Sequence, residues 1–351
     1  MRNFSELYGV DLTATVCPTC DRAFLVDTGT LPRSCPHCLD VTLVAIEQTD
    51  ELPPTPQPEL VVPFGVSAEN LTQQVNQFAN SYWFTPPDLT PANLQSRMTR
   101  QYVPVWLVDC DVSTRWQAEV GFDYDVLSHS EAYGSGGWQT TEKRKTRTNW
   151  EPRVGELTRH YDNMRAPALE EHSQLVKPLG KFKIWEAVEY DSAEHAQSVL
   201  FRLPNRISAD AWSDVVPTAL QRCEKDCMAA ASGQHIRQFH WEPTYQNHHW
   251  TSLLLPLYTT YYLDDEGNQI PLTLHGRSGN VIGRKVASIQ LAKRAALVIG
   301  AIALILLFLV ALGFMGVANE GIMLLMCPAM LLGLAAIWPF IYVSNLNSKT
   351  E

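Results

Sequence analysis

Two long apolar stretches near the end of this chain restrict the classes of protein to which it can belong. Residues 295–318 and 321–343 contain no charged residue and are separated by a short polar turn. As helices they would rise by about 1.5 Å per residue, which is enough to cross a hydrocarbon core of about 30 Å. Neither stretch has the polar stripe of a soluble surface helix. We predict a transmembrane helical hairpin over 295–343, kinked in its second helix at Pro328 and Pro339.

The charges around the two apolar stretches predict their orientation. Five cations precede the first stretch: Arg277, Arg284, Lys285, Lys293 and Arg294. The turn between the stretches carries one carboxylate and no cation. Under the positive-inside rule both ends of the chain then lie in the cytoplasm, including a short tail over residues 344–351. The first residues do not have a signal-peptide pattern, so we expect a multi-pass protein whose first 294 residues are cytoplasmic.

Two CxxC motifs near the start of the chain, Cys17-Pro-Thr-Cys20 and Cys35-Pro-His-Cys38, predict a metal site. Paired motifs at this spacing are typical of tetrahedral zinc sites, because each turn presents two thiolates to one ion. We predict that Cys17, Cys20, Cys35 and Cys38 bind one Zn²⁺ in a small β zinc ribbon over residues 1–46. Four thiolates leave no open position for water, so this zinc is predicted to be structural. Disulfides or a redox pair are the alternatives, which a reducing cytoplasm disfavours.

The segment after the ribbon, residues 47–59, is acidic and rich in proline. This composition is typical of an extended linker, and it predicts that the ribbon is mobile and held at a distance from the rest of the chain. Residues 60–294 then form an α+β cytoplasmic body with antiparallel strands. Periodicity predicts its main elements: helices from Ser67 to about Phe84 and over 208–231, and strands over 102–125, 139–150 and 236–263.

The charge balance argues against a nucleic-acid-binding protein. The formal net charge is −10, and the only dense basic cluster lies in one predicted strand, at Lys143, Arg144, Lys145 and Arg147. A solvated strand face is the plainest interpretation of this cluster. Contact with anionic lipid headgroups is the second interpretation, and contact with a phosphate backbone is the third.

An enzyme active site is a further hypothesis, although the sequence contains no HExxH, GxSxG or P-loop motif. Carboxylates lie close together in the sequence over residues 102–125, and histidines do so over 235–250. Strand alternation explains both groups as surface residues. The remaining cysteines of the body, Cys110, Cys223 and Cys227, are predicted to be small buried side chains.

Several short motifs along the chain carry a resemblance to a known family. After the CPTC and CPHC motifs come VVPFGVSAENL, YWFTPPDL, QYVPVWLVD, LLLPLYTTYYL and HGRSGNVIG, followed by the apolar hairpin. Together they resemble the uncharacterised bacterial TFIIB-type zinc-ribbon transmembrane proteins, which include the YdjG-like proteins. The family pattern often has Asn where this chain has His275. The resemblance implies a bacterial inner-membrane adaptor that some genomes encode near SPFH-like or phage-shock-type membrane-stress proteins, which are candidate partners. It implies no catalytic residue.

Three functions from different classes follow from these observations. The preferred hypothesis is a membrane-anchored zinc-ribbon scaffold, without enzymatic activity, that recruits a cytoplasmic protein partner to the inner membrane face. The second is a membrane-bound hydrolase of unknown substrate, and the third is nucleic-acid binding through the ribbon. The predicted architecture is thus multidomain: a β zinc ribbon, an α+β body and a two-helix transmembrane hairpin with the lipid bilayer around it.

Overall fold

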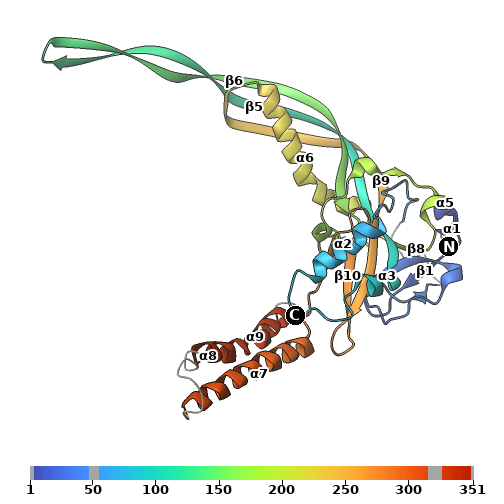
Figure 1. The fold of residues 1–351 in the computed structure, drawn as a ribbon. Coiled ribbons are helices and arrows are strands. Elements are labelled where there is room, and N and C mark those ends of the chain that lie inside the picture. Colours follow the sequence, from blue (N-terminus) through green and yellow to red (C-terminus); the bar gives the residue numbers. More distant parts are fainter. Residues whose placement is uncertain (1–3, 47–54, 315–325, 349–351) are drawn as a thin grey trace. The chain divides into compact units, whose positions relative to one another are not determined.

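The structure is a computed structural model that describes residues 4–46, 55–314 and 326–348, and its elements form two compact units (Figure 1). The first unit comprises Met1–Pro104, Glu170–Pro204 and Leu253–Glu351. The second unit comprises Val105–Leu169 and Asn205–Ser252. Two long strands, β5 (Thr99–Gly134) and β9 (His235–Leu263), contribute residues to both units.

The first unit is built on a mixed, mostly antiparallel sheet with the strand order β11-β10-β9-β5-β8-β2-β1-β3. Its shorter strands are β1 (Leu12–Val16), β2 (Ala23–Asp27), β3 (Val44–Ala45), β4 (Leu60–Val61), β7 (Val188–Glu189), β8 (Val199–Arg202), β10 (Gln269–His275) and β11 (Val281–Gly283). Strand β5 pairs with β8 in parallel, and β4 pairs with β9 in parallel. The prediction of a sheet rich in antiparallel strands is confirmed.

The helices of this sheet-based part of the first unit are short. They are α1 (Phe4–Tyr8), α2 (Ala68–Ala79), α3 (Pro91–Ser96), α4 (His172–Leu175) and α5 (Ser192–His195), with 3-10 turns at Thr28–Thr30, Lys177–Leu179 and Ile184–Glu186. Ser67 is the predicted N-cap of α2, and its hydroxyl accepts a hydrogen bond from the Asn70 amide. The helix ends at Ala79 and not at the predicted Phe84. Residues 80–84 turn away, and the Tyr82 hydroxyl donates to the Val286 carbonyl.

The N-terminal hairpin of β1 and β2 is part of the first unit's sheet. Phe24 pairs with Arg202 and Leu25 pairs with Phe201, so β2 lies directly beside β8. Side chains alternate along β2, and Leu25 therefore packs in one cluster with Phe201 while Phe24 packs on the cysteine side. The prediction that this hairpin is mobile and held at a distance from the body is wrong, because its strand β2 pairs with β8 within the sheet of the first unit. Residues 47–54 of the predicted linker lie outside the described residues.

The second unit has one long antiparallel ribbon with a helix on one face. Strands β5 and β6 (Gly137–Pro167) pair along their length, and α6 (Ser208–Ala231) packs against β6, with its small buried residues facing alternate residues of β5. The helix follows the predicted range. Its buried residues recur every four positions: Ala211, Val215, Ala219, Cys223, Cys227 and Ala231. This one ridge of small side chains lets α6 approach the sheet closely.

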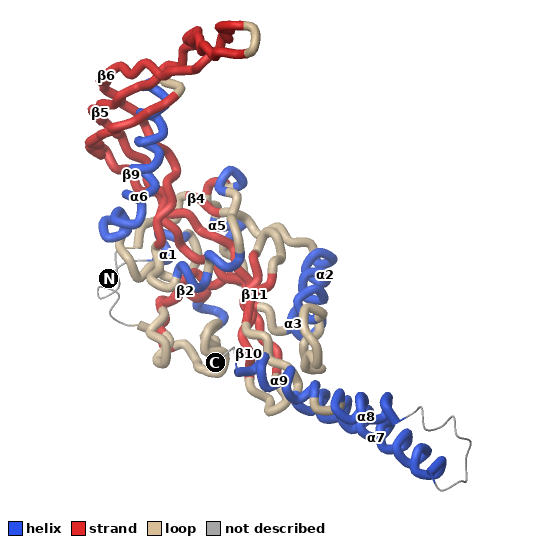
Figure 2. Tube along the Cα trace, turned by 90° about the vertical axis from the view of Figure 1, so that its left-hand side faces the viewer, coloured by secondary structure: helices blue, strands red, loops and turns tan. Residues whose placement is uncertain are grey.

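Two apolar helical segments end the first unit, as predicted. Helix α7 (Ile289–Phe314) lies beside α8 (Met326–Ala335) and α9 (Trp338–Ser348) in both views (Figures 1 and 2). The second segment is interrupted between α8 and α9, immediately before Pro339, which agrees with the predicted kink there. Pro328 lies in the first turn of α8. The predicted turn between the spans lies outside the described residues.

Candidate metal centre

Two similar backbone turns hold the four predicted cysteine ligands. In the first turn the Asp21 amide donates to the Cys17 carbonyl at 3.0 Å, and in the second the Leu39 amide donates to the Cys35 carbonyl at 2.8 Å. Both donors have a left-handed backbone, with φ of 52° at Asp21 and 66° at Leu39. Each turn therefore folds its CxxC segment tightly enough to bring two sulfur atoms to the same side.

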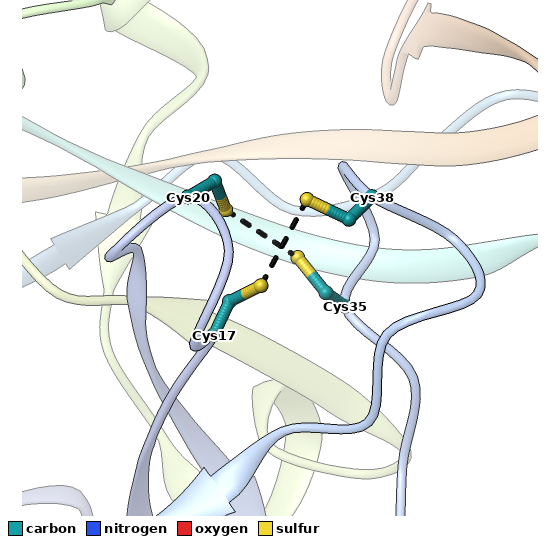
Figure 3. Close-up of side chains that lie close together, drawn as sticks. All are labelled: Cys17, Cys20, Cys35 and Cys38. Atoms are coloured by element: carbon teal, nitrogen blue, oxygen red, sulfur yellow. Dashed lines mark hydrogen bonds between the residues drawn. The ribbon is translucent and has the colours of Figure 1, made fainter.

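The four sulfur atoms form one compact cluster (Figure 3). The Sγ atoms of Cys17 and Cys38 are 3.8 Å apart, as are those of Cys20 and Cys35, and all four lie within 4.8 Å of one another. Tetrahedral ligands at about 2.3 Å from a central ion would be about 3.8 Å apart. The spacing is far too long for disulfides and matches four ligands around one metal ion.

The cluster is embedded in an apolar layer of the sheet. Cys17 and Cys35 are fully buried, and Cys20 and Cys38 are half-buried. Four buried apolar residues pack around them: Phe24, Val26, Leu43 and Leu200. Leu200 comes from β8, so the cysteine cluster is closed by a strand that lies far away in the sequence. Such a setting restrains the ligands and limits access of water.

The protonation of the thiols depends on burial and on nearby amides. Burial raises the pKa of Cys17, but hydrogen bonds from the Thr19 and Cys20 amides outweigh it and lower that pKa to about 7. Burial raises the pKa of Cys35 to about 11, and burial together with the neighbouring thiols also raises the pKa of Cys38. Thiols this close cannot all ionise alone, because their charges repel. A bound cation would supply the compensating charge and release the remaining protons.

A buried group of charged residues lies beside the cysteines. The Arg202 guanidinium is 4% exposed and donates to the Glu171 carboxylate at 2.9 Å and to the Ala23 carbonyl at 2.8 Å. Arg22 contacts the same carboxylate at 3.3 Å. Arg202 also lies over the Phe24 ring and is close enough to Cys20 for their charges to interact. Two arginines and one carboxylate thus leave a net positive charge next to a tetrathiolate centre, which would carry an excess of negative charge.

The residues of the enzyme hypothesis lie in the second unit as cross-strand surface pairs. His235 contacts Asp123 at 2.8 Å, and His160 contacts Asp111 at 2.7 Å. Glu119 pairs with Arg237. These side chains are between one-third and three-fifths exposed, which is the usual setting of surface ion pairs on a solvated sheet face. The predicted carboxylate and histidine stretches therefore meet, at Asp123 and His235.

The three cysteines that were predicted to be buried are indeed buried. Cys110 on β5 and Cys223 and Cys227 on α6 are all 0% exposed and belong to one apolar cluster. The two helix thiols are 4.0 Å apart. Burial raises the pKa of all three, so they are protonated, unreactive core side chains at neutral pH.

Comparison of the chain with family models, with curated proteins and with solved structures found no match. The chain is therefore characterised by its own fold and site. It has a four-cysteine cluster that could hold a metal ion, a mostly antiparallel mixed sheet, and two helices long and apolar enough to cross a membrane.

Sequence reasoning identified the four cysteines but missed the residues that surround them. Leu200 and Arg202 reach the site because β8 lies next to β2 in the sheet, and Glu171 contacts the site through its ion pair with Arg202. No motif marks these positions. A buried arginine can be suspected only when its strand neighbours are known, since an isolated Val-Leu-Phe-Arg segment is an ordinary strand.

Proposed function

We propose that this chain is a membrane-anchored adaptor that holds a cytoplasmic protein partner at the inner face of a bacterial membrane. In this proposal the metal is one structural Zn²⁺, both termini are cytoplasmic, and the chain catalyses no reaction. The observation that carries the proposal is the exposed apolar surface of the C-terminal helices, in a unit that also contains a rigid metal-ligand cluster.

The exposure of α7 supports the anchor. Leu297 is 73% exposed, Leu304 68% and Phe308 64%, and Val298, Ile302 and Ile305 between them are exposed as well. Leaving such a side chain in water costs about 1.5–3 kcal/mol relative to an apolar environment. A lipid environment removes this cost along the whole helix. Lys293 and Arg294 lie in the first turns of α7 and favour a cytoplasmic start.

Aromatic residues at the base of the helices support the same reading. Trp83 contacts Trp338, and Trp338 contacts Tyr342, with ring centroids 5.5 and 5.4 Å apart. Aromatic side chains concentrate at the interface between membrane and water. Below them the Asn347 side chain both accepts from and donates to the Ala287 backbone, at 2.9 and 3.2 Å. These hydrogen bonds hold the end of α9 against the residues that immediately precede α7.

The choice of zinc rests on the chemistry of the ligands. Four thiolates at tetrahedral spacing suit Zn²⁺, and reducing conditions keep them free to bind. A closed shell of four protein ligands gives the metal no position for substrate or water. The proposed zinc therefore stabilises the hairpin and takes no part in a reaction.

The proposed recruiting surface is formed by exposed residues around the two cysteine turns and the adjacent end strand. Thr19 is exposed inside the first cysteine turn, Asp40 is exposed directly after the second, and Val44 on β3 is 54% exposed. Because β3 is the last strand of the sheet, its outer edge is open to a partner. The metal and the sheet make this surface rigid, which lowers the entropic cost of binding. Membrane anchoring would raise the local concentration of a weakly bound partner.

The test is capture of proteins by the full chain from native membranes. We compare the wild-type chain with the variant Thr19→Arg, Asp40→Arg, Val44→Arg, which changes the proposed surface and leaves the cysteines intact. A matched control places three arginines on the exposed side of α2, at Gln73, Asn76 and Gln77. The surface variant is expected to lose a protein that the wild type and the control both retain, with unchanged metal content. SPFH-like and phage-shock-type proteins are the first candidates to look for in the captured set.

The same set of captured proteins from all three chains would contradict recruitment by this surface. A surface variant that also loses its metal would show that the substitutions disturbed the hairpin. In that case single substitution of Val44, which lies on β3 outside both cysteine turns, gives the decisive comparison.

A further inference from the structure

The far part of the β5–β6 ribbon extends beyond the rest of the second unit. Strand β9 begins at His235, which lies beside Asp123, and α6 ends at Ala231, whose carbonyl accepts from Arg153. From Asp123 to Thr148 the two strands therefore continue as a two-stranded arm, visible in Figure 1 as the long green hairpin. Almost every residue of the arm is exposed. A two-stranded ribbon on its own is marginally stable in water, so contact with a partner would stabilise this arm.

The strand register separates the charges of the arm onto its two faces. Residues directly opposite each other point to the same face, and successive residues alternate. Lys143, Lys145 and Arg147 lie opposite Ser128, Val126 and Tyr124, respectively. This basic face, formed by residues 124, 126, 128, 143, 145 and 147, has three cations and no carboxylate. None of the three cations forms an ion pair among the described residues.

The other face has the opposite charge. We define the acidic face as the residues whose positions alternate with those of the basic face. It has exposed carboxylates at Asp125, Glu131 and Glu142, and a single permanent cation, Arg144. It ends in an exposed aromatic pair, Tyr133 and Trp138, with ring centroids 5.4 Å apart. The two faces of one arm are therefore complementary in charge.

We propose that the arm binds a second copy of this chain, with the basic face of one arm against the acidic face of the next. Stacked sheets pack about 10 Å apart, which brings the lysines of one copy to the carboxylates of the other. The contact also covers Tyr124 and Leu127, which are 49% and 58% exposed. A continuous polyanion such as nucleic acid or an anionic bilayer is the poorer occupant, because the acidic face and the net charge of −10 both repel it.

The size of the arm sets the strength of this contact. From Asp123 to Gly134 the arm is about 40 Å long, so a contact about 10 Å wide along its whole length would bury about 800 Å² in total, counting both copies. Interfaces of that size are weak and transient. Association is therefore expected to require high local concentration and low salt, and to form open chains of copies because the contact joins two different faces.

The experiment measures sedimentation of the full chain in an uncharged detergent over a range of concentrations. One variant reverses the basic face, with Lys143→Glu, Lys145→Glu and Arg147→Glu. A second variant reverses the acidic face, with Asp125→Lys, Glu131→Lys and Glu142→Lys. Each variant alone is expected to associate at least about tenfold more weakly than the wild type, because three attractions become repulsions. An equimolar mixture of the two variants is expected to recover association, since reversed faces are again complementary.

Recovery in the mixture supports the proposal and also shows that both variants retain a folded arm. A wild-type chain that stays monomeric at low salt and high concentration would overturn it. Two further results would overturn it as well: association unchanged in the basic-face variant, or a mixture that remains monomeric. If the basic-face variant instead loses binding to phosphatidylglycerol vesicles while self-association is unchanged, the arm's partner is the bilayer and the proposal is wrong.

Discussion

Removal of the proposed metal from the four-cysteine centre is expected to open the N-terminal hairpin and leave most of the sheet paired. The hairpin is held by the cysteine cluster, by apolar contacts and by a short pairing with β8 that joins two residues on each strand. On the cysteine side the apolar contacts come from Phe24, Val26, Leu43 and Leu200, each at most 5% exposed. Burying four such side chains contributes about 6–12 kcal/mol as an upper estimate.

A structural zinc site contributes a similar amount, about 10–16 kcal/mol in small zinc modules. Loss of the metal therefore removes about half of what stabilises the cysteine side of the hairpin. Because a whole domain is stable by only about 5–15 kcal/mol, this loss is sufficient to unfold strands β1 to β3. Strand β8 would then lose its neighbour on one side, while it keeps its parallel pairing with β5.

Hydrogen–deuterium exchange of the full chain, before and after chelation under reducing conditions, measures this directly. Peptides over residues 12–45 are expected to lose protection completely, and peptides over 199–202 in part. Peptides from β10 (Gln269–His275) are the internal control and are expected to be unchanged. Retained protection over 12–45, in protein that elemental analysis finds free of metal, would refute the reasoning.

Three further predictions concern stability and are measured by denaturant unfolding in detergent. Arg202→Met should destabilise the first unit by about 1–3 kcal/mol, because the largely buried Glu171 carboxylate keeps only Arg22 as its ion-pair partner. Arg97 donates a hydrogen bond to Asp88 and lowers the pKa of that carboxyl group. The ionised Asp88 therefore stabilises the folded state above its unfolded pKa of about 4. This stabilisation is lost as the pH falls through the pKa of Asp88 in the folded state. The difference in stability between wild type and Asp88→Asn should therefore be large at pH 7 and shrink toward pH 3. Ala219→Leu should destabilise the second unit by about 1–3 kcal/mol through overpacking under α6, whereas Gln221→Leu on the exposed side should have little effect.

Features encoded over a few residues could be predicted from the sequence. The four cysteines, the range of α6 and the buried face of α2 follow from motif spacing and periodicity. The apolar character of α7 and of α8 with α9 follows from composition alone. Motif spacing, helical periodicity and apolar composition each depend on a few neighbouring residues, and tertiary contacts did not change the structure of these segments.

Features that depend on distant strand pairing could not be predicted. The acidic, proline-rich segment after residue 46 suggested a mobile ribbon, but β2 pairs with β8 through Leu25 and Phe201. That pairing also brings Arg202 to the cysteines, and Glu171 contacts Arg202 and Arg22 there. The C-terminal end of α2 was misjudged for the same reason, since residues 82–84 turn toward the end of the chain, where Phe84 contacts Tyr342.

The separation of charges onto the two faces of the arm could be predicted only in part. Strand alternation was predicted for residues 116–125, and the basic cluster at 143–147 was visible in the sequence. Which residues share a face depends on the register across the turn, in which Gly134 pairs with Gly137. A shift of one residue would place the lysines beside the carboxylates, so only the register separates the two faces.

The most direct test of the proposed adaptor is the distribution of the captured partner between membrane and soluble fractions of cells. Cells carry the wild-type chain, the variant Thr19→Arg, Asp40→Arg, Val44→Arg, the α2 control variant, or no chain. The partner is expected in the membrane fraction with the wild type and the control, and in the soluble fraction in the other two strains. A partner that stays in the membrane fraction without the chain, or with the surface variant, would contradict the account.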